Sequence, residues 1–70
     1  MKRGNMGVKV LKKHENSITG IRVELTQKMT IRGKVIHAVV VTNMRTDRHI
    51  LIKAFDKIGD AFSLYKKALA

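Results

Sequence analysis

The chain has 70 residues, and its 15 Lys and Arg side chains against 5 Asp and Glu give a formal net charge of +10. This length allows one small domain and excludes a nucleotide-binding α/β domain, a barrel and a two-domain active-site cleft. So large an excess of positive charge indicates a polyanionic partner.

The remaining composition narrows the class of protein further. The chain has no Cys, which excludes a disulfide framework and a thiolate zinc site. Its hydrophobic content of 44% is too high for a disordered basic tail. The apolar runs are far shorter than the ~20 residues of a membrane-spanning helix. We therefore expect a cytoplasmic protein that makes no contact with membranes.

The first half of the chain predicts a basic arm and two strands. Residues 1–7 are basic and no apolar run follows them, so we expect a flexible N-terminal arm ahead of a single domain over residues 8–70. The first strand is expected over residues 8–13. From Ile18 to Ile31, apolar and polar side chains alternate, as in a strand with one buried face.

The second half predicts two more strands and a helix. Residues 35–42 carry apolar side chains at both odd and even positions, which is typical of a central strand with two buried faces. Residues 48–55 are expected to form the fourth strand. Apolar residues then recur at helical spacing from Ile58 to Leu69, and Asp56 precedes them as an N-cap. The predicted fold is α+β: a four-stranded antiparallel β-meander with one C-terminal α-helix packed on one face.

The register of the strands is predicted from the turn residues. We expect two-residue hairpin loops at residues 16–17 and 32–33 and a three-residue loop at residues 44–46. This register places Leu25 opposite Val40 and gathers apolar side chains of all four strands on the face that the helix covers.

The uncovered face of this predicted sheet has basic margins and an apolar ridge along its middle. The ridge consists of Val39, Val41 and Leu51. A monomer has little reason to expose such a ridge to water, and small domains without disulfides often gain stability by oligomerising. We therefore expect a homodimer with these three residues at its interface.

The positive charge is interpreted as a phosphate-binding surface. Lys and Arg side chains displace condensed counterions from nucleic acid and give affinity with little sequence discrimination. The basic N-terminal arm and two basic hairpin tips suit the backbone or grooves of a duplex. The candidate contacts are Lys2, Arg3, Lys9, Lys12, Lys13, Arg22, Lys28, Arg32, Lys34, Arg45 and Arg48.

Stacking and catalysis both lack support in the sequence. Readers of single strands stack bases on exposed aromatic rings, and of the three rings here Phe62 and Tyr65 fall on the apolar stripe of the helix. The scattered carboxylates form no acid/base or metal pair, and the three His residues share no metal-ligand spacing. We therefore expect no enzyme, no metal, no cofactor and no small-molecule substrate.

These observations favour a small basic nucleic-acid-binding protein that acts as a homodimer. We expect mostly phosphate-backbone contacts, low sequence specificity, and DNA rather than RNA as the partner. Two alternatives remain open. One is a structural or protein-interaction module whose apolar sheet face mediates oligomerisation, and the other is an RNA-binding, ribosome-associated component.

Overall fold

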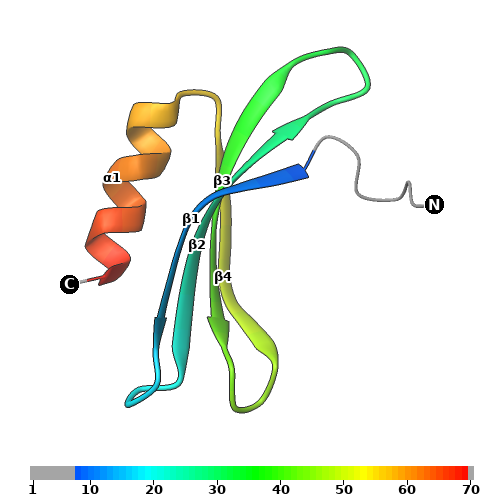
Figure 1. Ribbon diagram of the computed structural model, residues 1–70. Coiled ribbons are helices and arrows are strands. Elements are labelled where there is room, and N and C mark those ends of the chain that lie inside the picture. The colour runs from blue at the N-terminus through cyan, green and yellow to red at the C-terminus, as the bar shows by residue number, and fades with distance from the viewer. Residues whose placement is uncertain (1–7, 70) are drawn as a thin grey trace.

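The structure is a computed structural model that describes residues 8–69. Four antiparallel strands form one open sheet in the order β1-β2-β3-β4, and a single helix packs against one face of it (Figure 1). The elements are β1 (Val8–Asn16), β2 (Ile21–Met29), β3 (Val35–Asn43), β4 (Arg48–Phe55) and α1 (Ile58–Leu69). The predicted α+β fold is confirmed. The expected N-terminal arm, with Lys2 and Arg3, lies outside the described residues.

The core lies between α1 and the two central strands. Val23 and Leu25 of β2 and Val39 of β3 are buried there against Ala61 and Tyr65 of α1. The two helical residues are four positions apart and therefore lie on the same face of the helix, as the predicted stripe requires.

The start of α1 differs from the expected cap. The helix begins at Ile58, and the Ala61 amide donates a hydrogen bond to the Lys57 carbonyl, so Lys57 holds the N-cap position. Asp56 instead lies beside Lys34 of the neighbouring hairpin, with 3.3 Å between Oδ1 and Nζ.

The predicted register between β2 and β3 is wrong by one residue. The Thr30 amide donates to the Lys34 carbonyl at 2.8 Å and the Gly33 amide donates to the Thr30 carbonyl at 2.9 Å. The loop inside this closing pair therefore has three residues instead of the expected two. Gly33 takes a φ of +83°, the left-handed conformation that such a loop requires of its last residue.

This shift turns β3 and β4 over relative to β2, because side chains alternate between faces along a strand. Leu25 pairs with Val39, where the sequence predicted Val40. The prediction that Val39, Val41 and Leu51 line the uncovered face is therefore wrong: all three lie on the face of α1. Val39 has an exposed fraction of 0%, so it is not available to a partner.

We call the sheet face opposite α1 the open face. By the observed pairing it carries Ile36, Ala38 and Val40 of β3 with Ile52 and Ala54 of β4. An uncovered apolar surface in the middle of the sheet is thus present, but different residues form it from those that the sequence predicted.

Strand β1 also departs from the expected register. It closes on β2 through a four-residue loop over residues 17–20, and a β-bulge at Leu11 shifts the pairing between Val10 and Lys12. Val8 and Val10 consequently fall on the open face and are about half exposed, although the predicted register gathers the apolar side chains of this strand on the helix-covered face. The bulge also moves Lys9 to the face of α1.

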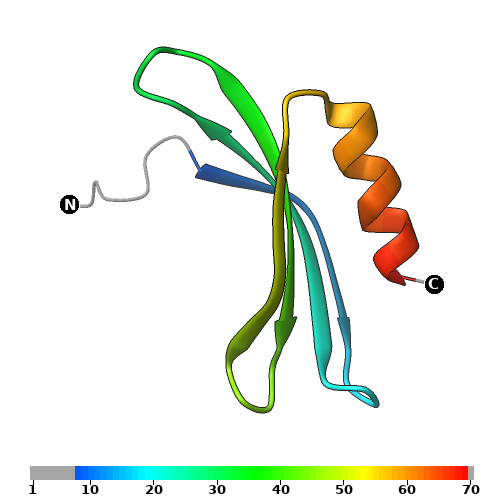
Figure 2. The same ribbon diagram turned by 180° about the vertical axis from the view of Figure 1, so that it is seen from behind.

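The sheet bends away from the helix at two hairpins. In Figure 1 the β2–β3 hairpin swings to the side opposite α1 and projects past the part of the sheet that the helix covers. The loop between β3 and β4 bends toward the same side at the other end of the sheet, and Figure 2 shows the same arrangement from behind. The open face therefore has a hairpin at each end.

Candidate nucleic-acid interface

Carboxylates balance only a small part of the positive charge. Of the five in the chain, three lie near a cation. These contacts join Arg22 to Glu15 and Glu24, and Lys34 to Asp56. The other two, Asp47 and Asp60, are exposed. Because only two of the 15 cations lie outside the described residues, the described surface keeps a large positive excess.

Arg22 lies on the open face, as expected, but its charge is already balanced. Its Nη1 is 3.6 Å from Glu15 Oε2 and its Nε is 3.5 Å from Glu24 Oε1. The Nε atom is also buried. A guanidinium held between two carboxylates attracts phosphate weakly, so the arrangement argues against the expected role of Arg22 as a nucleic-acid contact.

Arg45 has a structural task that the sequence did not reveal. Its Nη2 donates a hydrogen bond of 2.8 Å to the Ile18 carbonyl, which ties the β3–β4 loop to the β1–β2 loop. The side chain passes so close to Gly20 that an added Cβ there would lie 3.0 Å from Arg45 Nε. Arg48, at the start of β4, is exposed at the same end of the sheet.

The β2–β3 tip, defined as residues 28–34, gathers three of the predicted contacts. Lys28, Arg32 and Lys34 line one open hollow and are all exposed. The ion pair between Lys34 and Asp56 is exposed on both sides, so it is weak and salt-sensitive. The tip is the place where the structure brings predicted cations together.

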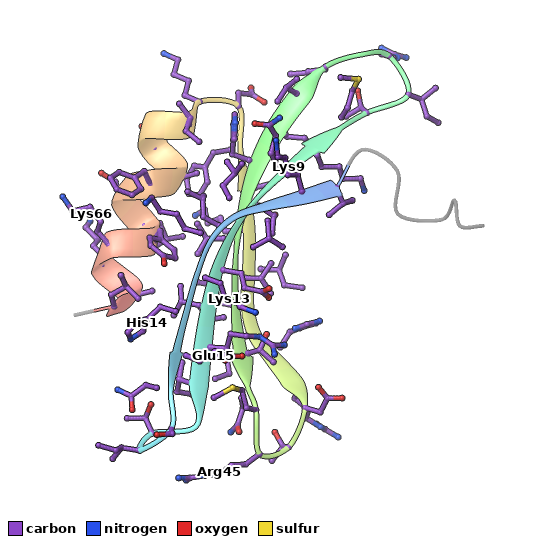
Figure 3. The ribbon with its side chains drawn as sticks, in the orientation of Figure 1. Lys9, Lys13, His14, Glu15, Arg45 and Lys66 are labelled. Carbon is purple, nitrogen blue, oxygen red and sulfur yellow. The ribbon has the colours of Figure 1, made fainter. Side chains whose placement is uncertain are left out.

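The β1 cations are divided between the two faces of the sheet. Lys13 and Glu15 lie on the open face, whereas Lys12 and His14 lie on the side of α1, and Figure 3 shows His14 and Glu15 on opposite sides of the strand. Lys9 pairs with Gln27, the residue before the β2–β3 tip, and so lies at the base of that tip. Lys9 therefore lies near the tip but on the opposite face of the sheet from Lys28, while Lys12 and Lys13 are separated from each other.

A further cluster was missed by the sequence reasoning. Phe62 of α1 is partly exposed, and the ammonium groups of Lys12 and Lys66 lie 5.9 and 5.6 Å from its ring centroid. Its ring also stacks on buried Tyr65 with 6.2 Å between centroids. The spacing of Phe62 on the helical stripe predicts burial, and only the path of β1 shows that the ring lies at the rim of the core.

Residues 8–69 offer no cluster of metal-ligating side chains. No group of three or more His, Cys, Asp or Glu side chains in residues 8–69 could hold a metal ion. Within the same range, no helix has the length and apolar character needed to cross a membrane.

Comparisons with known proteins give no relative: no protein family, no curated protein and no solved structure matches the chain.

Proposed function

We propose that the protein binds duplex DNA through phosphate contacts made mainly by the β2–β3 tip and Lys9. The observation that carries this proposal is the concentration of cations at one projecting hairpin, opposed by a single exposed carboxylate. Such contacts position a protein on the backbone without reading base sequence, so we propose low sequence specificity. A cytoplasmic location accords with this role.

Duplex is favoured over single-stranded nucleic acid because exposed aromatic rings are few. Binding to single strands relies on several rings on which successive bases stack. Phe62 is partly exposed but Tyr65 is buried beneath it, which leaves one accessible ring at this place.

The test is a binding series at low salt with three probes: a duplex DNA, a single-stranded DNA of the same length and a structured RNA. We expect the tightest binding to the duplex. A failure of all three to bind would refute the proposal. A much higher affinity for the RNA than for either DNA would instead indicate that the protein has an RNA-associated role.

The variant that locates the site is Lys28→Ala combined with Arg32→Ala. Its matched control is Lys57→Ala combined with Lys67→Ala, which removes the same charge from the region of α1. We expect the tip variant to weaken duplex binding by roughly tenfold or more near 0.1 M salt and the control to weaken it less than about threefold. Equal losses of affinity would show that the net charge of the protein determines duplex binding and that the tip is not a specific binding site.

Self-association is a second candidate function, supported by the open face. Ile52 is 60% exposed and lies beside Val40 on an uncovered part of the sheet, and Val10 is 50% exposed. We propose that two copies join through this face to form a homodimer. Light scattering tests the idea: we expect twice the chain mass of 7.9 kDa, reduced to one chain by Ile52→Asp but not by Ile18→Asp. A monomeric mass at high concentration would refute it.

A further inference from the structure

The β2–β3 tip carries an apolar side chain that the fold does not use. Ile31 is fully exposed, with a relative accessibility of 105%. Its loop is closed by Thr30, whose amide and hydroxyl both bond to Lys34, and by Gly33, which supplies the positive φ. Polar residues are the usual occupants of such turns, so neither the loop geometry nor the core calls for Ile at this position.

The surroundings of Ile31 are basic. Lys28, Arg32 and Lys34 line the same hollow as Ile31, with Met29 beside them. The described part of the chain places no carboxylate in the lining of this hollow. An apolar end flanked by cations is complementary to a base-pair step, in which an apolar stack lies between two phosphate backbones.

The position of the tip allows it to reach into a groove. The hairpin projects past the helix-covered part of the sheet, on the side opposite α1 (Figure 1). A two-stranded β-hairpin is slender enough to follow a groove of the duplex, and apolar wedges at such positions unstack a base step.

We propose that Ile31 inserts from the minor groove between two base pairs of duplex DNA and kinks the duplex, while Arg32 and Lys34 contact the flanking phosphates. This inference rests on the proposed function and adds the mode of binding to it. Wedges of this kind bend DNA by roughly 20–90°. Steps that unstack easily, such as TA, are expected to be preferred.

The experiment measures affinity and bending separately on the same short duplex. Fluorescence anisotropy gives the affinity, and energy transfer between dyes at the two duplex ends gives the bend. The variants are Ile31→Ala, Ile31→Leu and the matched control Ile18→Ala, which removes an equally apolar side chain, 85% exposed, from a loop without Lys or Arg.

We expect the wild type to bring the duplex ends closer and to bind a duplex with a central TA step roughly threefold or more tighter than one without it. Ile31→Ala should abolish the bend and the TA preference while its affinity falls less than about tenfold, because the phosphate contacts remain. Ile31→Leu and Ile18→Ala should behave as the wild type. Binding without bending, or a bend that survives Ile31→Ala, would overturn the wedge alone. An absence of duplex binding would overturn the proposed function together with the wedge.

Discussion

Replacing neighbouring valines of β3 separates the two faces of the sheet. Val39 has an exposed fraction of 0% and contributes to the core with Leu25 and Tyr65, whereas Val40 lies on the open face and is partly exposed. Val39→Ala removes two buried methyl groups, worth about 1.6 kcal/mol in transfer free energy. The cavity left behind raises the total loss to roughly 2–3 kcal/mol.

Val40→Ala lowers the β-propensity of the position by the same amount as Val39→Ala but removes little buried area. We therefore expect the free energy of unfolding to fall by about 1 kcal/mol or less. A domain of this size has a total unfolding free energy of roughly 4–10 kcal/mol. Val39→Ala should therefore lower Tm by roughly 10–20 °C and Val40→Ala by a few degrees.

Thermal unfolding followed by circular dichroism measures the difference between the two variants. The scans are run at two protein concentrations, because dimerisation through the open face would make Tm concentration-dependent and would add to the effect of Val40→Ala. Equal losses at low concentration, or a larger loss for Val40→Ala, would refute the register and with it the assignment of the two faces.

Three further sets of substitutions test the two glycine turns, the charge balance at Arg22 and the rim of the core. Gly20→Ala should cost roughly 2 kcal/mol and Gly33→Ala about 1 kcal/mol in urea denaturation, because both have positive φ but only Gly20 has a neighbour within 4 Å, the Arg45 side chain. A greater loss at Gly33 would contradict this reading. The fold loss in duplex affinity for Arg22→Ala should be less than a third of that for Arg32→Ala, because two carboxylates already balance the charge of Arg22. Comparable losses would show that Arg22 belongs to the interface. Phe62→Leu should change duplex affinity less than about twofold, and a loss above roughly tenfold would indicate that bases stack on this ring.

The architecture was predictable because it depends on periodicity. The alternation in β2 and the helical spacing from Ile58 to Leu69 are both visible in the sequence, and both elements are present in the structure. The core contributions of Val23, Leu25 and Tyr65 follow from the same patterns. These signals are averages over many residues, so an error at one position does not change them.

The faces of β3 and β4 were not predictable because they depend on single residues. Arg32-Gly33 is compatible with a two-residue loop closed by Ile31 and Lys34, but the observed loop is closed one residue earlier, by Thr30 and Lys34. Residues 35–42 carry apolar side chains at both odd and even positions, so the hydrophobic pattern of this strand does not show which face is buried. The one-residue error in register could therefore not be detected from the sequence. The bulge at Leu11 likewise places Val8 and Val10 on the opposite face of the sheet from the one expected.

The candidate site was predicted in part for a similar reason. The charge excess and the basic residues of the β2–β3 tip are properties of the sequence. The balancing of Arg22 by two carboxylates and the bond from Arg45 to the Ile18 carbonyl depend on which strands and loops are neighbours. Neither contact could be assigned before the register was known.

The salt dependence of duplex binding tests the central claim most directly. If Lys9, Lys28, Arg32 and Lys34 each contact a phosphate, the logarithm of the binding constant should fall with the logarithm of salt concentration with a slope of about −3.6. Lys28→Ala with Arg32→Ala should reduce the magnitude of that slope by about 1.8. A slope near zero, or one that this double variant leaves unchanged, would contradict the account.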